Sequence, residues 1–121
     1  MTEKQLWQVT LFLRLFKDTA AVHFHFADRG NTLSTVAHLG ITLAQARECV
    51  LGVTEKDYYR GPIADKSPHG GEYWEFGVSV QGREVFIKLK VDTTNQVAVC
   101  FAFHFPDSPM VYPHRRGRGK I

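Results

Sequence analysis

Three consecutive stretches near the C-terminal end decide the fold: YWEFGVSV (residues 73–80), EVFIKLKV (84–91) and QVAVCFAFH (96–104). Each alternates between two kinds of side chain. In the second stretch, aliphatic residues at 85, 87, 89 and 91 alternate with Phe86, Lys88 and Lys90. Alternation with a period of two predicts a β-sheet that packs one face on a core and leaves the other face open.

The third stretch extends the same pattern to the end of the sheet. It predicts Val97, Val99, Phe101 and Phe103 on the core side and Ala98, Cys100, Ala102 and His104 on the open side. The connections Gln81-Gly82 and Asp92-Thr-Thr-Asn95 are short, so these three strands are expected to be antiparallel neighbours.

Helices are expected ahead of this sheet. Thr2-Glu-Lys-Gln5 has the pattern of a capping box, and apolar residues recur at helical spacing from Leu6 to Phe16. A helix is therefore predicted over residues 3–18. A strand is the alternative, because the apolar residues at 9, 11, 13 and 15 also alternate.

Local signals predict several shorter elements after the first helix. They are a strand over 21–26, a helix over 32–39 capped by Asn31 and stopped by Gly40, a helix from the capping box Thr42-Leu-Ala-Gln45 through Leu51, and a brief helical turn over 54–57. Residues 61–71 hold two prolines and three glycines. They are expected to form an exposed loop, which is a natural place for substrate contact.

Together these elements predict an α+β fold in which N-terminal helices pack on one face of a C-terminal antiparallel sheet. The chain of 121 residues is long enough for one domain, expected over 1–110, followed by a basic tail over 111–121 that is expected to be flexible. Arg115, Arg116, Arg118 and Lys120 fall in this tail. Without these four, 11 Lys and Arg stand against 12 Asp and Glu, so the body is about neutral.

Composition and the cysteine count also limit the class of protein. Hydrophobic residues make up 44% of the chain, which indicates a globular protein. Two cysteines, Cys49 and Cys100, provide no disulfide framework and suit a reducing compartment. Neither a signal peptide nor an apolar run of membrane-spanning length is found, so a cytoplasmic protein without a membrane partner is expected.

The open face of the predicted sheet carries the chemistry. It presents Glu75, Lys88, Lys90 and His104, which suit the binding and cleavage of a phosphodiester. His104 is the best candidate for a catalytic acid or base, because an imidazole gives and takes protons near neutrality. Lys88 is placed to stabilise a phosphate, and Glu75 is a second acid/base candidate. The alternatives are a surface histidine, a solubilising lysine and a cross-strand ion pair of Glu75 with Lys88 or Lys90.

Other residues are predicted to bind RNA around these groups. Arg60 offers a bidentate fork for a phosphate, so it joins the catalytic set, and the preceding tyrosines can stack on bases unless one of them belongs to the core. The predicted RNA contacts are Tyr58, Tyr59, Lys90, Arg115, Arg116 and Arg118. His23 and His25 share a strand face, but no second ligand pair accompanies them, so no metal or other cofactor is expected.

Four segments resemble one family of proteins. They are Glu48-Cys-Val-Leu-Gly-Val-Thr-Glu-Lys-Asp-Tyr-Tyr-Arg60, Val80-Gln-Gly-Arg-Glu-Val-Phe-Ile-Lys-Leu-Lys90, Val97 through His104, and Thr32-Leu-Ser-Thr-Val-Ala-His-Leu-Gly-Ile-Thr42. In order and spacing these segments resemble the motility quorum-sensing regulator (MqsR) toxins over about residues 10–105. The resemblance implies a RelE-like fold, a toxin of a type II toxin–antitoxin system that cleaves messenger RNA without a metal, and a cognate antitoxin protein with a helix-turn-helix.

The resemblance also implies roles for particular residues. Arg60 matches a family lysine, Phe86 falls where the family has a catalytic tyrosine, His104 falls where it has a lysine, and Glu75 lies near a family glutamine. Phe86 has no proton to donate, so an acid/base role falls on His104, Glu75 or a nearby tyrosine. The expected activity is cleavage of single-stranded mRNA through attack of the 2′-hydroxyl. The alternative is a non-catalytic RNA- or protein-binding module that uses the same open face.

Overall fold

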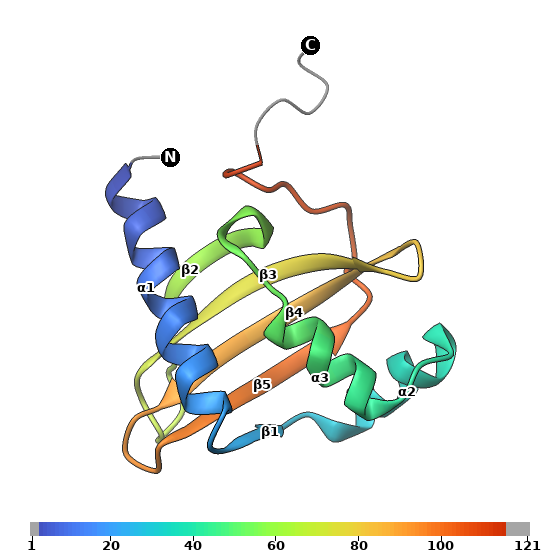
Figure 1. Ribbon diagram of the computed structural model, residues 1–121, viewed down its shortest axis with the longest axis horizontal. Helices are drawn as coiled ribbons and strands as arrows, with labels where there is room; N and C mark the ends of the chain where they lie inside the picture. The colour runs from blue at the N-terminus through green and yellow to red at the C-terminus, as the bar shows by residue number, and fades with distance from the viewer. Residues whose placement is uncertain (1–2, 116–121) are drawn as a thin grey trace.

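A computed structural model describes residues 3–115 and confirms an α+β fold (Figure 1). Three helices and a short strand come first, and a one-turn 3-10 helix and four longer strands follow. The elements are α1 (Glu3–Ala20), β1 (Phe24–Phe26), α2 (Arg29–Leu39), α3 (Leu43–Leu51), η1 (Glu55–Asp57), β2 (Tyr58–Ala64), β3 (Glu72–Val80), β4 (Arg83–Asp92) and β5 (Val97–His104).

The sheet has the strand order β1-β5-β4-β3-β2. Strands β3, β4 and β5 pair antiparallel, as the short connections predicted, and β2 also pairs antiparallel with β3, but β1 runs parallel to β5. The prediction of a wholly antiparallel sheet is therefore wrong at β1. No hairpin joins β1 to β5, because almost the whole of the remaining fold lies between them in sequence, and only a tight turn would force the antiparallel direction.

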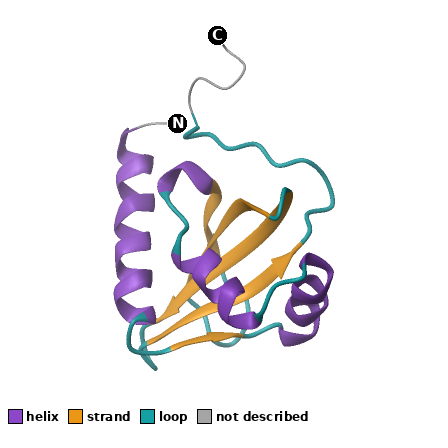
Figure 2. Cartoon of the chain, turned by 45° about the vertical axis from the view of Figure 1, so that its right-hand side comes forward, coloured by secondary structure: helices purple, strands orange, loops and turns teal. Residues whose placement is uncertain are grey.

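Helix α1 covers one face of the sheet. It buries Val9, Leu13 and Phe16 against β4 and β5, whereas Leu11 and Leu15 are exposed. This spacing is helical, so the predicted helix is confirmed and the alternative strand is excluded. The predicted capping residue, Thr2, lies outside the described residues. In Figure 1 α1 and α3 lie in front of the sheet, and Figure 2 shows the same helices from the side; within residues 3–115 no helix covers the opposite face.

The ends of helices α2 and α3 agree with the predicted capping signals in two cases and differ in one. The capping box at the start of α3 is formed, with Gln45 N–H donating to Thr42 Oγ1 and Thr42 N–H donating to Gln45 Oε1. Gly40 ends α2 in the left-handed conformation, as predicted. The start of α2 was predicted too late, because Asp28 is the N-cap and Asn31 lies within the first turn, where its amide donates to Asp28.

Residues 58–64 form a strand that the sequence analysis assigned partly to a loop. Strand β2 lies at the edge of the sheet, and its register with β3 shifts twice, between Tyr58 and Arg60 and between Arg60 and Ile63. An edge strand with such irregularities tolerates Gly61 and Pro62, because one side of its backbone needs no ladder partner. Only residues 65–71 remain as the loop before β3.

A bulge in β5 changes which side chains face the core. Lys88 pairs with Ala102 while Leu89 pairs with Cys100, so Phe101 is the extra residue. Before the bulge, Ala98 and Cys100 face the core, where both are fully buried, and Val99 shares the open face with Lys90. The predicted faces are therefore wrong for residues 97–101. After the bulge they are confirmed, with Phe103 in the core and His104 on the open face.

Candidate active site

Three of the four predicted catalytic residues lie in one row across the open face. Arg60 on β2 is opposite Glu75 on β3, and Glu75 is opposite Lys88 on β4. Neighbouring strands are about 4.8 Å apart, so the side chains of one row lie within reach of one ligand group. We refer to Arg60, Glu75 and Lys88 as the charged row.

Arg60 and Glu75 form an ion pair within this row. The Nε atom of Arg60 lies 2.5 Å from Oε1 of Glu75, and the carboxylate side chain is only 5% exposed whereas the arginine is 62% exposed. This hydrogen bond, followed by the attraction between the two charges, raises the pKa of Arg60. No described residue accepts a bond from the terminal guanidinium nitrogens, so they remain for an incoming anion.

Lys88 is held more loosely than Arg60. Its ammonium nitrogen lies 4.2 Å from the centre of the Tyr73 ring and 5.8 Å from that of Phe101, and none of the ion pairs among residues 3–115 includes it. A cation–π contact of this kind is worth about 0.5–1 kcal/mol at a partly exposed site. The lysine can therefore exchange this contact for a phosphate at small cost. The predicted ion pair of Glu75 with Lys88 or Lys90 is replaced by the pair with Arg60.

His104 lies one step along the sheet from the charged row. It is opposite Phe86, and the two rings are 5.2 Å apart at a tilt of 31°. Because Phe86 and Lys88 are two residues apart on β4, His104 lies diagonally across from Lys88, about 7–8 Å away in ordinary sheet geometry. Glu75 and His104 therefore flank Lys88 from β3 and β5.

The hydrogen bond of His104 determines which of its ring nitrogens is available for proton transfer. Its Nδ1 atom is 3.0 Å from the carbonyl oxygen of Phe105. A carbonyl only accepts, so Nδ1 carries the proton in this bond. Nε2 is then the nitrogen that gains and loses a proton, and it can act as either acid or base.

Lys90 differs from Lys88 although both lie on the same face of β4. Its ammonium donates to Asp65 Oδ2 at 2.6 Å and to the carbonyl oxygen of Gly70, and its side chain is 8% exposed. The hydrogen bond from Lys90, together with that from Ser67, lowers the pKa of Asp65 well below its usual range. Lys90 was predicted to contact the RNA backbone, but in the structure it anchors the loop over residues 65–71.

The two tyrosines before Arg60 have different environments. Tyr58 is buried in the core, where its hydroxyl donates to the carbonyl oxygen of Gly61 at 2.6 Å, so its ring is not available for stacking on a base. Tyr59 is half-buried, with the Arg60 guanidinium carbon 5.2 Å from its ring centre. Of this pair, only Tyr59 lies beside the charged row.

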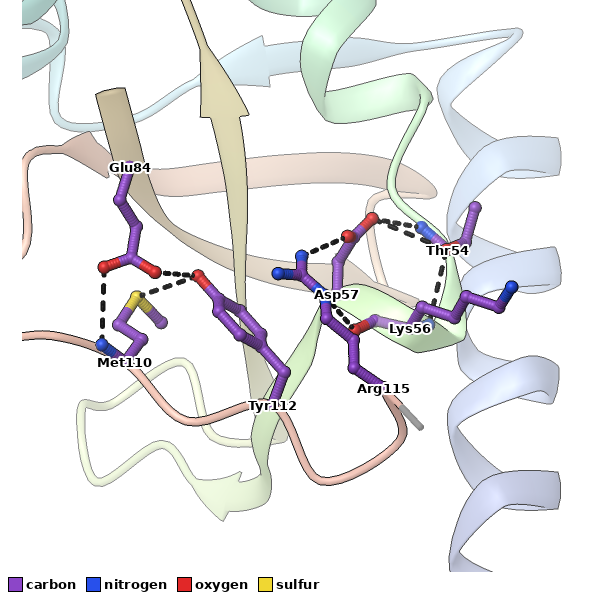
Figure 3. A network of polar contacts seen from close by, with 7 residues as sticks. All are labelled: Thr54, Lys56, Asp57, Glu84, Met110, Tyr112 and Arg115. Carbon is purple, nitrogen blue, oxygen red and sulfur yellow. Dashed lines mark hydrogen bonds and ion pairs between the residues drawn. The ribbon is translucent and has the colours of Figure 1, made fainter. Parts of the chain in front are cut away.

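The segment after β5 returns across the open face near the β3–β4 turn (Figure 3). The hydroxyl of Tyr112 donates to Glu84, which also accepts the backbone N–H of Met110. Arg115 binds Asp57 Oδ1 at 2.9 Å and the carbonyl oxygen of Lys56 at 3.1 Å. We call residues 110–115 the strap. Arg115, a predicted RNA contact, is thus engaged within the protein, and Arg116 and Arg118 lie outside the described residues.

The described residues outside this site provide neither a metal site nor a reactive thiolate. Within residues 3–115, no group of three or more His, Cys, Asp or Glu side chains could hold a metal ion, and the rings of His23 and His25 are 6.5 Å apart. Both cysteines are free, and burial raises the pKa of Cys100 to about 12, which disfavours a thiolate nucleophile there. In the described part of the chain, no helix is long and apolar enough to cross a membrane.

Two features of the site were missed in the sequence analysis. Tyr73 supports Lys88, and it could have been found, because it alternates with Glu75 on the same strand face. The partner of Lys90, Asp65, could not have been found, because it lies in a loop 25 positions away with no periodic signal.

No protein-family model, curated protein or solved structure matches the chain.

Proposed function

We propose that this protein is an endoribonuclease that cleaves single-stranded mRNA by attack of a 2′-hydroxyl on the adjacent phosphate, acting as the toxin of a type II toxin–antitoxin system. The observation that carries the proposal is the charged row on a face without a helix, with His104 beside it. A carboxylate and an imidazole can supply the two proton transfers of this reaction, and two cations can stabilise the charge that develops on the phosphate. The resemblance to the MqsR toxins points to the same activity.

The reaction divides among these groups according to their places on the sheet. A phosphate on Lys88 has Glu75 on one side and His104 on the other, which suits in-line displacement. Glu75 takes the proton of the 2′-hydroxyl, and that oxygen forms a bond to phosphorus. The bond from phosphorus to the 5′-oxygen breaks, and protonated His104 supplies a proton from Nε2 to the leaving oxygen. The products are a 2′,3′-cyclic phosphate and a 5′-hydroxyl.

The cations stabilise the charge that develops in this reaction. Lys88 and the terminal nitrogens of Arg60 face the phosphate oxygens as the phosphorane forms. Removing one such group costs roughly 10²–10³-fold in rate, and each proton transfer contributes roughly 10²–10⁴-fold. The 2′-hydroxyl of the substrate is itself the nucleophile, so the reaction needs no metal-bound water.

The deciding experiment uses a matched pair of RNA oligonucleotides. The full chain, in buffer with EDTA, is expected to cleave a single-stranded RNA and leave 2′,3′-cyclic phosphate ends. The same sequence with a 2′-deoxy nucleotide at the cleaved position is expected to stay intact. Equal cleavage of both substrates, or complete dependence on added divalent metal, would contradict the mechanism.

A pair of lysine variants tests whether cleavage depends on the open face. Lys88→Ala is expected to lower the cleavage rate, whereas Lys17→Ala, which removes a charge from α1, is expected to leave it unchanged. A protein that binds RNA but never cleaves it, with wild-type Lys88 and His104, would favour the non-catalytic binding module instead.

The toxin role is tested in cells, apart from the chemistry. Expression of the chain alone is expected to arrest growth, and His104→Ala at equal protein level is expected to relieve the arrest. The antitoxin is expected to cover Lys88, Arg60 and His104 with an acidic surface. Normal growth with abundant, folded wild-type protein would contradict the toxin role and leave the ribonuclease assay to decide the activity.

A further inference from the structure

A pocket of about 520 Å³ lies at the end of the open face beyond Lys88. Val99 and Phe101 line it from β5, His25 from β1 and His69 from the loop over residues 65–71, and Asp28 and Asp92 lie at its wall. Its volume falls in the range of ordinary small-molecule sites. The pocket takes no part in the reaction described above.

The loop that walls this pocket is fixed from several sides. The buried ammonium of Lys90 holds Asp65 and the carbonyl oxygen of Gly70, and Asp65 N–H donates to the carbonyl oxygen of Gly71 at 2.9 Å. Gly70 and Gly71 both have positive φ, and a Cβ on Gly71 would lie 3.3 Å from Cε of Lys90. Glycine therefore allows the loop to close over the lysine, and the pocket is formed before any ligand binds.

Phe101 connects this pocket to the charged row. Its ring centre lies 5.8 Å from the ammonium of Lys88 and 5.9 Å from that of Lys90. The two lysines are two residues apart on β4, which corresponds to about 7 Å along a strand. A single nucleotide can span this distance, so a phosphate on Lys88 brings an attached nucleoside to the mouth of the pocket.

The chemistry of the pocket suits a base better than a phosphate. Asp28, Asp65 and Asp92 outnumber the single ammonium of Lys90, which disfavours an anion there. Both oxygens of Asp65 and of Asp92 already accept hydrogen bonds, whereas in Asp28 only Oδ2 accepts one, from Asn31, among the described residues. Oδ1 of Asp28 is thus left as an acceptor for an N–H group.

We propose that this pocket binds one nucleobase of the RNA beside the cleaved phosphate, and that it selects bases with an exocyclic amino group over uracil. The base stacks on Phe101 between the imidazoles of His25 and His69. Its amino group donates to Asp28, where uracil would present a carbonyl oxygen to a carboxylate. This inference rests on the proposed function, since it makes the pocket part of the RNA-binding surface.

Direct binding tests the pocket without any need for cleavage. Adenosine, cytidine, guanosine and uridine are titrated into the isotope-labelled full chain and followed by NMR. We expect shifts at Val99, Phe101 and Gly70, with uridine about fivefold weaker than the best amino-bearing nucleoside. Asp28→Asn is expected to remove most of this preference, and Asp107→Asn, an exposed carboxylate at a distance, serves as its control.

Stacking is tested by Phe101→Leu, which keeps an apolar side chain, and by His69→Ala in the exposed part of the loop. Each is expected to weaken nucleoside binding about fivefold or more, as loss of a stacked aromatic partner does. Thermal melts check that the variants fold. Unchanged affinity in both folded variants would overturn the proposal.

Cleavage and competition distinguish the failure of this inference from that of the proposed function. Nucleoside binding at the pocket, displaced by single-stranded RNA in a protein that does not cleave it, supports the base site and contradicts the ribonuclease. Cleavage with the same kcat/KM on all sequences in wild type and in Asp28→Asn supports the ribonuclease and overturns the base site. A nucleoside bound at the pocket that RNA cannot displace also overturns it.

Discussion

The centre of the open face and its loop-covered end differ in what their charges do. At the covered end, Lys90 is buried and bound to Asp65 and Gly70, so its charge holds the loop over residues 65–71. At the centre, Lys88 rests on the Tyr73 ring without a described carboxylate partner. Two lysines that are equivalent in strand pattern therefore have different environments, one buried and paired and one resting on an aromatic ring.

The physical basis of this difference is desolvation. A buried ammonium has lost water and depends on its partners, so removing the ammonium alone leaves those partners without compensation. A half-exposed ammonium on an aromatic ring keeps part of its hydration and can move to a new anion.

The largest effects are expected at the two residues that flank Lys88. Glu75→Gln and His104→Ala are each expected to lower the single-turnover rate of RNA cleavage by roughly 10²–10⁴-fold, because each removes a proton transfer. Equal thermal melts would show that both variants fold. A folded variant with wild-type turnover would remove that residue from the mechanism.

The two lysines, Lys88 and Lys90, are expected to differ in how much each contributes to the free energy of unfolding. Lys90→Ala is expected to lower the free energy of unfolding by about 2 kcal/mol, because it takes the buried partner from Asp65 and Gly70. Lys88→Ala is expected to change it by less than about 0.5 kcal/mol, as at an ordinary surface position. Urea unfolding of the two variants measures both values. Equal losses in the two variants would show that the loop does not depend on the buried lysine.

The stabilising effect of the Asp65–Lys90 pair is expected to depend on pH. The Lys90 hydrogen bond lowers the pKa of Asp65 in the folded state, so its contribution is present above the pKa of an unfolded aspartate, about 3.9. The contribution is lost as the pH falls below that value toward the folded-state pKa. The difference in unfolding free energy between wild type and Asp65→Asn is therefore expected to be constant from pH 8 to 5.

Below about pH 4 that difference is expected to shrink. Urea unfolding at a series of pH values gives the measurement, and Asp107→Asn is the control that shows the general effect of acid. A difference that grows on acidification would mean that the carboxylate is destabilising in the folded state.

The smallest effect is expected where the strap crosses β3. A Cβ on Gly77 would collide with the hydroxyl of Tyr112, so Gly77→Ala is expected to displace the strap at a cost of about 1 kcal/mol. The amides of Met110 and Arg115 are expected to exchange hydrogen faster, because the shift takes Met110 away from its acceptor Glu84 on β4 and moves Tyr112, whose carbonyl oxygen accepts from Arg115. Unchanged hydrogen exchange at both amides would show that β3 shifts to accommodate the new methyl group and that the strap stays in place.

The candidate site was predictable where it depends on strand pattern. Alternation along β3 and β4 placed Glu75 and Lys88 on one face, and the short hairpin brought them opposite one another. The same alternation failed in β5, because a bulge at Phe101 reverses the faces before it. The pairing of Lys90 with Asp65 was not predictable, since no local rule links a strand lysine to a loop carboxylate 25 residues away.

Elements with local signals follow from the amino-acid sequence alone. Side-chain periodicity set α1 and the three long strands, and capping groups set the start of α3 and the end of α2. Only the tertiary structure decided the parallel edge at β1, the strand at β2, the bulge and the choice of Lys90 for burial. These features depend on contacts between segments distant in the chain, where packing and desolvation outweigh the conformational preference of any single residue.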